Sequence, residues 1–421
     1  MAKRSDHYLR NEAERVRAAK AEELAAVFAQ RAADHDRSGT FPFENFADLR
    51  EAGCLKWTVP AEFGGDGISL YELVALQERI AYGDGSTGLA LGWHLGMVLH
   101  FRESGRWPEE RFAELCRDVV GGGAMINSFA SEPASGSPSR GGRPDTRAVR
   151  TDGGWLITGR KTYSTLSPIL DRFIVTAWIE EEGAVEEFLV FREGGGIRIE
   201  ETWDTLGMRA TGSHDVVLEQ VFVPDRYRLG RSAGRGVDDG GGWLLHIPAC
   251  YIGIARAARD AALRFARGYK PSSVNVPIAE LANVQYAIGR MEAELRTARS
   301  LLYAVAERWD REPENRGAMR PDLGLAKYVA TNSAIRVVDQ AMRIVGGASL
   351  SRSMPLERYY RDVRAGLHNP PMDDNVLRLL AADALADAAE VAAAMDAKDA
   401  AAADQAAKAP PERAGEGGVS S

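Results

Sequence analysis

Cysteine is scarce in this chain, with only Cys54, Cys116 and Cys250 among 421 residues. An odd number of widely separated cysteines disfavours both a disulfide framework and a thiolate zinc site. No pair or trio of histidines and carboxylates has metal-ligand spacing, and no Gly-x-Gly-x-x-Gly motif follows a predicted strand. The sequence therefore argues against a bound metal and against a nicotinamide-binding fold.

Long hydrophobic runs and an excess of basic charge are also missing. No stretch approaches the roughly 18 consecutive apolar residues of a membrane span. The first segment, MAKRSDHYLRNEAERVRAAK, lacks the apolar core of a signal peptide. The formal net charge is −8, and acidic and basic residues are mixed along the chain. We therefore expect a soluble cytoplasmic protein with neither a nucleic-acid nor a membrane partner.

The composition is that of an ordinary globular protein, and the secondary structure that the sequence predicts changes twice along the chain. Hydrophobic residues make up 45% and charged residues 27% of the chain. Helical patterns fill the first 125 residues or so, and short β-branched runs such as RFIVTAWIE and DVVLEQVFV follow. Helical periodicity then returns in four long segments separated by prolines, near 243–267, 279–310, 322–345 and 372–396.

This order predicts a mostly helical α+β fold with three domains. We expect an N-terminal helical domain over 1–123, a small β-barrel over 124–230 and a C-terminal four-helix bundle over 231–398. The Ala/Gly/Pro-rich residues 399–421 are expected to form a tail whose last part is disordered.

Three short motifs in the middle of the chain bear on chemistry. The loop SFASEPASGSPSRG can bring backbone N–H groups and serine hydroxyls against a polar or anionic ligand. The segment LITGRKTYST is a turn followed by a strand, in which Tyr163 and Thr165 share one face. The third motif, LGMRATGSHDVVLEQVFVP, is a strand flanked by glycine and proline. Each motif alone is a weak signal.

Taken together and in order, these segments resemble the acyl-CoA dehydrogenase family over about Leu24 to Ala386. VPAEFGGDGISLYELVALQERIAYGDGS resembles its Pro-Glu-x-x-Gly-Gly turn before a helix. SEPASGS resembles its Thr-Glu-Pro-Gly-Ala-Gly-Ser loop, and GRKTYST its Gly-x-Lys-x-Trp-Ile-Thr strand. RIVGGASLSRSMPLERYYRDVR resembles the Gly-Gly turn and the Arg-Asp pair near the end of its helical bundle.

The resemblance implies an FAD held between barrel and bundle, in a homotetramer or homodimer whose FAD also touches a neighbouring subunit. Tyr163 would replace the family's tryptophan against the flavin ring, and Thr165 would hydrogen-bond near flavin N5. Arg343, in place of a usual glutamine, and Gly347 would meet the partner subunit's FAD. The family's Arg-x-Thr-Phe-Gly segment has no match in YKPSSVNVPIAELANVQ. The implied cofactor-binding residues are Ser128, Ala130, Ser131, Gly136, Ser137, Tyr163, Thr165, Arg343 and Gly347.

The chain departs from the family at the catalytic base. In most members a glutamate follows the Arg-Asp pair by a fixed interval, and Pro370 occupies that position here. Other members carry the glutamate on the first bundle helix, where this chain has Trp243, with Leu244 in place of a frequent arginine. Neither carboxylate is present, so the proton-removing group of an acyl-CoA dehydrogenase must lie elsewhere or be absent.

Three hypotheses follow. The first is a dehydrogenase that oxidises an acyl thioester at Cα–Cβ, with His368 as base (or Asp373 or Asp374, otherwise expected to be helix N-terminal charges), and with an electron-transfer flavoprotein as partner. The second is a two-component monooxygenase that acts on a small organic substrate with O2 and with FMN or FAD reduced by a flavin reductase. The third is a non-catalytic FAD-binding relative.

In the monooxygenase hypothesis, His368 and His94 are the catalytic imidazoles. Relatives of this kind resemble the chain in having no glutamate and in placing a histidine after the Arg-Asp pair. His94 comes from DGSTGLALGWHLGMV, a strongly apolar segment in which a single histidine is more often a hydrogen-bonded core residue. Because dehydrogenation is the commonest chemistry of the fold, the sequence ranks the acyl-CoA dehydrogenase first and the monooxygenase second.

Overall fold

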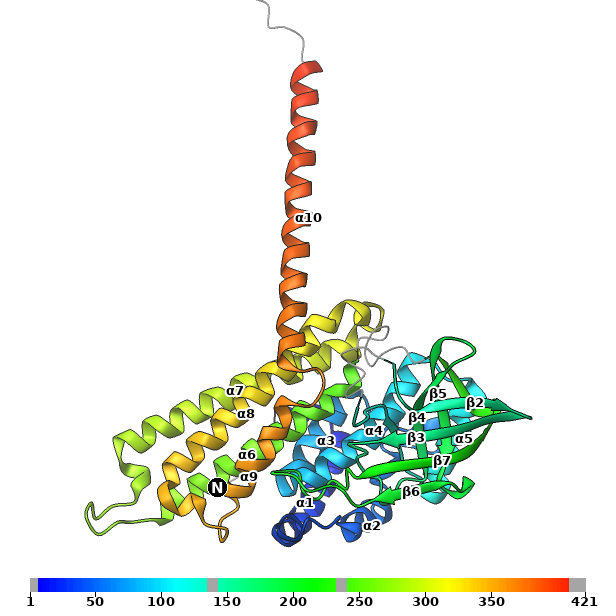
Figure 1. Ribbon diagram of the computed structural model, residues 1–421. Helices are drawn as coiled ribbons and strands as arrows, with labels where there is room; N and C mark the ends of the chain where they lie inside the picture. The colour runs from blue at the N-terminus through cyan, green and yellow to red at the C-terminus, as the bar shows by residue number, and fades with distance from the viewer. Residues whose placement is uncertain (1–6, 135–142, 232–240, 409–421) are drawn as a thin grey trace, which may run out of the picture. The chain divides into compact units, whose positions relative to one another are not determined.

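The computed structural model describes residues 7–134, 143–231 and 241–408. The chain divides into two units, Met1–Asp373 and Asp374–Ser421. The first unit contains the N-terminal helices, the β-sheet and most of the C-terminal helices (Figure 1). Nearly all of α10 (Asp373–Lys408) lies in the second unit.

The N-terminal part is helical because its apolar residues recur with helical spacing between clear capping residues. Asn11 accepts the N–H of Glu14 at 2.9 Å where α1 begins, and Asp84 accepts the N–H of Thr87 at 3.0 Å where α4 begins. Every α4 residue from Gly85 to Phe101 is buried, so this helix is apolar on all sides. The elements are α1 (Glu12–Ser38), α2 (Phe43–Glu51), η1 (Cys54–Lys56), η2 (Ala61–Phe63), α3 (Leu70–Gly83), α4 (Gly85–Ser104) and α5 (Glu109–Gly122).

The middle part is one eight-stranded sheet, with strands in the order β6-β7-β3-β2-β4-β5-β8 and β1 paired with β4. Neighbouring strands are antiparallel except β1 and β2, which run parallel to β4. The path of hydrogen-bonded strands begins at β6 and ends at β8. The strands are β1 (Ile126–Phe129), β2 (Arg147–Thr151), β3 (Gly154–Lys161), β4 (Arg172–Ile179), β5 (Ala184–Phe191), β6 (Ile197–Glu200), β7 (Asp215–Pro224) and β8 (Arg228–Arg231).

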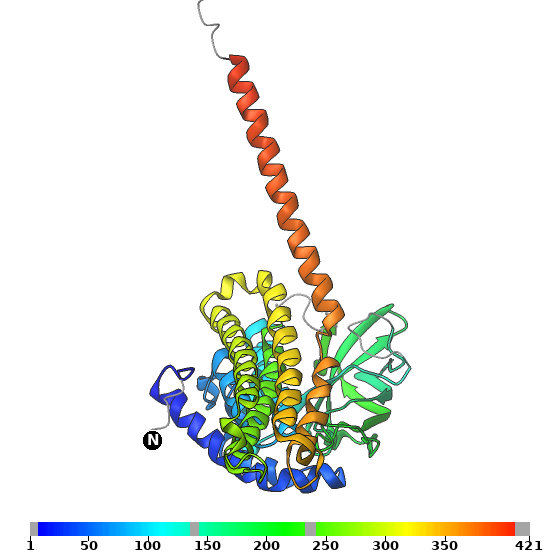
Figure 2. The same cartoon turned by 90° about the vertical axis from the view of Figure 1, so that its left-hand side faces the viewer.

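The C-terminal helices of the first unit pack beside one another and against α3 (Figures 1 and 2). α6 approaches α3 so closely that a Cβ on Gly253 would lie 2.4 Å from the carbonyl oxygen of Glu78. Only glycine permits this separation. The elements are η6 (Gly242–Leu245), α6 (His246–Gly268), η7 (Ile278–Glu280), α7 (Ala282–Arg311), η8 (Pro313–Met319), α8 (Arg320–Val345), η9 (Gly346–Leu350), α9 (Leu356–Asp362) and η10 (Val363–Leu367).

The predicted order of helical, β and helical parts is confirmed, and one boundary differs. The segment expected to be helical over 372–396 is α10, which continues to Lys408 and so includes the start of the predicted tail. Alanine, the strongest helix former, dominates these added residues. Residues 409–421 of the predicted tail lie outside the described residues.

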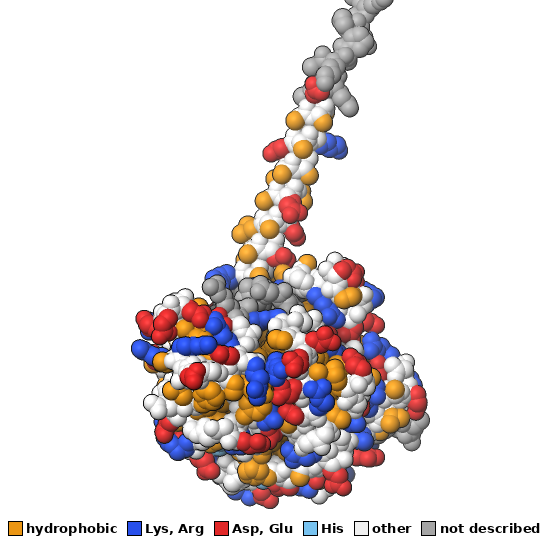
Figure 3. All heavy atoms as spheres, turned by 90° about the vertical axis from the view of Figure 1, so that its right-hand side faces the viewer, with side chains coloured by type: hydrophobic (Ala, Val, Ile, Leu, Met, Phe, Trp, Pro, Cys, Tyr) orange, Lys and Arg blue, Asp and Glu red, His pale blue; other side chains and the backbone are white. Residues whose placement is uncertain are grey.

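None of the helices in residues 7–134, 143–231 and 241–408 is long and apolar enough to cross a bilayer. On the face shown in Figure 3, Lys and Arg side chains lie among Asp and Glu side chains.

Candidate functional site

A cavity of about 520 Å³ lies between the sheet and the helices of the first unit. Its walls come from α4, from the end of β1, from the loops after β3 and before β7, and from η10 with the residues that follow it. Six of the predicted site residues line this cavity: Ser128, Ala130, Ser131, Tyr163, Thr165 and His368. Segments that are distant in the sequence therefore meet at this cavity.

The loop after β3 is held on both sides by backbone hydrogen bonds. The N–H of Thr162 donates to the carbonyl of Ser131 at 2.9 Å, and the N–H of Ser164 donates to that of His214 at 3.2 Å. Between them Tyr163 has a φ of 54° and a 66% exposed side chain. This conformation is unfavourable for an aromatic residue and persists because its neighbours impose it. The loop presents the tyrosine ring at the cavity wall.

A chain of hydroxyl groups ends at Thr165. Its Oγ1 lies 2.9 Å from the Oγ of Ser213, which lies 2.7 Å from the Oγ1 of Thr211. Thr211 in turn donates to the carbonyl of Met208 at 3.1 Å. Each hydroxyl has one proton and a carbonyl oxygen only accepts, so Ser213 must donate to Thr211, and Thr165 must donate to Ser213. Thr165 therefore faces a ligand in the cavity as a hydrogen-bond acceptor.

His368 lies at the end of η10, on a loop that is fixed to α6. Its N–H and that of Asn369 both donate to the carbonyl of Ala365, at 3.0 and 3.2 Å. The buried Tyr251 hydroxyl donates to Oδ1 of Asn369. The imidazole is exposed at the cavity wall, and within the described part of the chain it makes no hydrogen bond or ion pair. It is thus a positioned and accessible proton donor or acceptor.

One carboxylate, Glu132, lines the cavity among the described residues, and it is already engaged. Its Oε1 accepts from Nζ of Lys161 at 2.5 Å, and its two oxygens also accept the N–H groups of Asp145 and Thr146. Burial alone would raise the pKa of Glu132, but Lys161 and these donors lower it. The pair holds the Ser131 loop on the sheet, and a carboxylate stabilised in this way is a poor base.

His94 lies in the interior, outside the lining of the cavity. It is 0% exposed; its Nε2 donates to the carbonyl of Leu55 at 3.0 Å, and its Nδ1 accepts the N–H of Ile126 at 3.2 Å. Burial lowers the pKa of His94 to about 4. Both ring nitrogens are hydrogen-bonded to backbone groups. His94 is therefore a structural residue that joins η1 and β1 to α4.

The remaining predicted residues lie apart from the cavity or outside the described part. Gly136 and Ser137 lie outside the described residues. Arg343 is on the exposed side of α8, paired with Asp339 at 2.8 Å, and Gly347 is in η9. Their contact with a partner subunit's FAD stays a prediction. Asp373, an alternative base, accepts from Lys327 and Asn332 instead.

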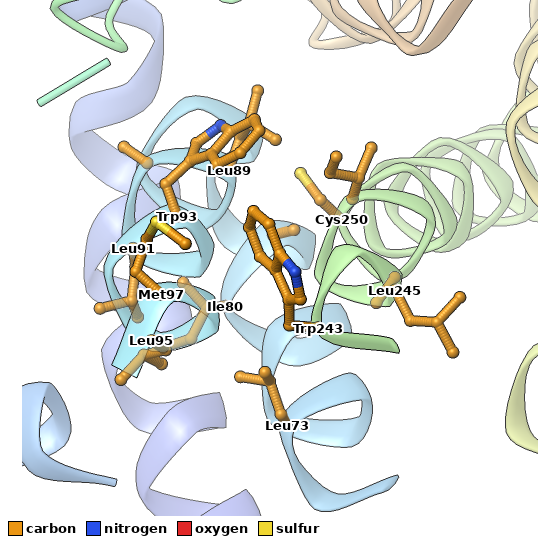
Figure 4. Packing of buried hydrophobic residues seen from close by; sticks show 14 of the residues in the cluster. Leu73, Ile80, Leu89, Leu91, Trp93, Leu95, Met97, Trp243, Leu245 and Cys250 are labelled. Carbon is orange, nitrogen blue, oxygen red and sulfur yellow. The ribbon is translucent and has the colours of Figure 1, made fainter. Parts of the chain in front are cut away.

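Both positions at which relatives carry the glutamate are filled by other side chains. Pro370 lines the cavity. Trp243 is buried behind Trp93, with the two rings 5.9 Å apart in a T-shaped contact (Figure 4). Trp93 and Leu89, both on α4, line the cavity and form an apolar wall there.

Sequence reasoning missed Trp93, Tyr251 and Ser213. A single sequence contains little that would reveal them, because each owes its role to the segment packed against it. The one available signal was a tyrosine within the otherwise apolar start of α6, since a buried hydroxyl requires a partner.

Comparison with known proteins identifies the family. The acyl-CoA dehydrogenase N-terminal, middle and C-terminal domain models match residues 10–106, 128–221 and 245–369. The putative acyl-CoA dehydrogenase YdbM of Bacillus subtilis (strain 168) is 48% identical over 90% of this chain and 98% of its own length. The amino sugar nitrososynthase RubN8 of Streptomyces rubradiris is 36% identical over 81% of this chain and 82% of its own.

A solved structure has the same fold. The dibenzothiophene monooxygenase TdsC of Paenibacillus sp. A11-2 superposes with a TM-score of 0.76 at 26% identity, over 87% of this chain and 96% of TdsC. Its FMN-bound form superposes with a TM-score of 0.79 at 25% identity over the same shares.

The cavity has the chemistry that a flavin requires. Its volume is within the range of about 300–1,000 Å³ that is usual for small-molecule sites. Its lining combines apolar side chains that can cover the faces of the ring with hydroxyl-bearing residues that can meet its polar edge. The apolar residues include Leu89, Trp93, Phe129 and Met208, and the hydroxyl-bearing ones include Ser128, Ser131 and Thr165. On the domain matches, the identity to YdbM and this site, the chain belongs to the acyl-CoA dehydrogenase family of flavin-dependent enzymes.

Proposed function

We propose that this protein is a flavin-dependent monooxygenase that uses reduced flavin and O2 to oxidise a small organic substrate. The observation that carries the proposal is the acid–base content of the 520 Å³ cavity. Among described residues its one carboxylate, Glu132, is paired with Lys161, whereas the imidazole of His368 is accessible. In most members of the family a carboxylate removes the α-proton of the thioester, and this cavity has no free one among the described residues, whereas an imidazole can donate the proton that oxygen transfer needs.

When bound, reduced flavin would supply the two electrons by which one oxygen atom of O2 enters the substrate and the other leaves as water. In this proposal Tyr163 would cover one face of the ring, and Thr165, whose own proton goes to Ser213, would accept a hydrogen bond from the ring's edge. His368 donates the proton that the departing oxygen needs. Leu89 and Trp93 exclude water from the reacting side.

The names of relatives support this choice over the commonest chemistry of the fold. RubN8 is a nitrososynthase and TdsC a monooxygenase, and the TdsC structure contains FMN. We infer that reduced FMN or FAD from a flavin reductase is the cofactor, and that the protein is a homotetramer or homodimer. Light scattering of the purified protein would give its oligomeric state.

An acyl-CoA dehydrogenase remains the second candidate, favoured by the 48% identity to the putative acyl-CoA dehydrogenase YdbM. In this case FAD would be the cofactor, an electron-transfer flavoprotein the acceptor, and His368 the base. Relatives often carry an arginine at the position of Leu244. A leucine there supplies no positive charge that could bind CoA, and this weakens the second candidate.

Two flavin measurements separate the candidates. The monooxygenase should bind reduced FMN or FAD more tightly than the oxidised form, as measured anaerobically by fluorescence. Its absorbance should not change when the flavin-loaded protein is titrated anaerobically with acyl-CoA thioesters of several chain lengths. Bleaching by any of these thioesters would instead support the dehydrogenase, and failure to bind flavin in either redox state would contradict both.

A further inference from the structure

A second cavity, of about 660 Å³, lies beside the first and is rich in arginine. Its lining comes from α1, from the loop before β7, from α6, and from α9 with the segment that leads into it. Thr205, Leu206 and Arg361 line both cavities, so the two share a wall. Among the described residues six arginines line this arginine cavity: Arg37, Arg209, Arg264, Arg352, Arg358 and Arg361.

Two carboxylates, Asp36 and Glu357, line the same cavity in the described part of the chain, and Arg361 binds both. Its Nη2 lies 2.5 Å from Oδ2 of Asp36 and 2.8 Å from Oε2 of Glu357. Arg209 and Arg37 pair with carboxylates outside the lining, Asp204 and Asp34, at 3.0 and 3.2 Å. These three arginines are therefore neutralised within the chain.

The other three arginines have no such partner. In residues 7–134, 143–231 and 241–408, no carboxylate lies within 4.0 Å of the guanidinium of Arg264, Arg352 or Arg358. Arg358 is 6% exposed and stacks near the ring of Tyr359, at 5.3 Å from its centroid. Tyr359 and the more distant charges of Asp84, Asp362 and Asp36 offset the burial of this guanidinium, which faces the cavity without a directly paired carboxylate.

We propose that the arginine cavity binds a small molecule through its phosphate or diphosphate group. Guanidinium groups donate pairs of parallel hydrogen bonds that match phosphate oxygens, and three of them converge on this space from α6, α9 and the segment before α9. Leu206, Met354 and Tyr359 offer an apolar surface for the organic remainder of the ligand. The inference rests on these contacts and does not depend on the oxidation proposed above.

Inorganic pyrophosphate is the probe for this site. Flavin-saturated, full-length protein is titrated calorimetrically with pyrophosphate, so that the probe cannot take the place of the flavin's own phosphates. The double variant Arg264→Gln/Arg352→Gln removes two exposed cations and should fold normally. Arg296→Gln on α7 is the matched control, because Arg296 is 71% exposed and lies outside the cavity lining.

We expect saturable binding whose affinity falls at least tenfold in the double variant and is unchanged in the control. Arg358→Lys keeps the positive charge but removes the planar guanidinium and its paired N–H donors. If the variant folds, binding should weaken about three- to tenfold. Absence of saturable pyrophosphate binding at low salt, or equal affinity in the double variant, would overturn the proposal. Because heat of binding is measured directly, a failure of the monooxygenase reaction would leave this result unchanged.

Discussion

At the scale of single residues, two histidines of this chain have opposite surroundings. His94 is fully buried with both ring nitrogens hydrogen-bonded, whereas His368 is exposed at a cavity wall. The same side chain is stabilised as a neutral structural group in one place and left accessible to a ligand in the other. Each environment leads to a different measurable consequence.

His94→Gln should change how stability depends on pH. Burial lowers the pKa of His94 from its ordinary value of 6.5 to about 4. The unfolded chain therefore binds this proton more tightly than the native protein, and native stability falls as the pH falls from about 6.5 to about 4. Urea unfolding should show a loss of about 2 kcal/mol between pH 7 and pH 5 that the variant lacks. Parallel pH profiles would contradict the structural assignment.

His368→Ala should lower turnover by about a hundredfold, the usual contribution of one general acid or base. The affinity for flavin should stay within about twofold, because the hydroxyl and backbone groups that would hold the ring are unchanged. His35→Ala is a suitable control, since His35 lies outside the cavity lining and binds Thr40 and Glu44. Turnover equal to that of the unmodified enzyme would show that the proton donor is another group.

At the scale of elements, α3, α6 and α7 are joined by one buried carboxylate. Glu78 on α3 lies 2.5 Å from Nη1 of Arg256 on α6 and 2.9 Å from Nη2 of Arg299 on α7. Its Oε2 also accepts from the hydroxyl of Tyr303 at 2.8 Å. Because Glu78 is 0% exposed, its charge depends on these partners.

Glu78→Gln should destabilise the protein by about 3 kcal/mol, since it leaves the partly buried Arg256 and Arg299 without the counter-charge of a fully buried carboxylate. Burial alone would raise the pKa of Glu78, but Arg256, Arg299 and Arg79 lower it from 4.5 to about 2. This contribution is therefore complete above about pH 4.5 and is lost as the pH falls toward 2. Chemical unfolding at pH 7 measures the cost. Glu219→Gln, whose partner Arg198 is 55% exposed, should cost less than about 1 kcal/mol.

Two glycine-to-alanine substitutions should have opposite effects. At Gly253 the new methyl group would lie 2.4 Å from the carbonyl oxygen of Glu78, so α6 must move from α3, and we expect a loss of about 2 kcal/mol or more. At Gly289 in α7 nothing lies within 4 Å, and alanine should add about 0.5–1 kcal/mol through helix propensity. Thermal unfolding of both variants checks the prediction; destabilisation at Gly289 would contradict it.

At the scale of the first unit, the 520 Å³ cavity is lined by residues from all three parts of the fold. Tyr163 and Thr165 come from the sheet part, His368 from the C-terminal part, and Trp93 from the N-terminal helices. A ligand that bridges these parts binds only the folded state and therefore stabilises all of them together.

Flavin should raise the unfolding temperature of the protein. At a free concentration of about 100 times Kd, binding adds about 2.7 kcal/mol to the free energy of unfolding. If the protein is a monooxygenase, reduced flavin under anaerobic conditions should raise the temperature more than oxidised flavin at the same concentration. Differential scanning fluorimetry or calorimetry with FMN and FAD checks the order. A larger shift with the oxidised form would favour the dehydrogenase.

The sequence by itself determined the order of helical, β and helical parts, because apolar periodicity is a local property of the chain. Its collinear motifs also predicted Tyr163, Thr165 and His368, which line one cavity. Only the tertiary structure decided that His94 has both nitrogens occupied and that Tyr251 holds the His368 loop. The arginine cavity likewise has walls from four distant segments. Burial and side-chain contacts form between segments, and the residue pattern of one segment does not show which other segment packs against it.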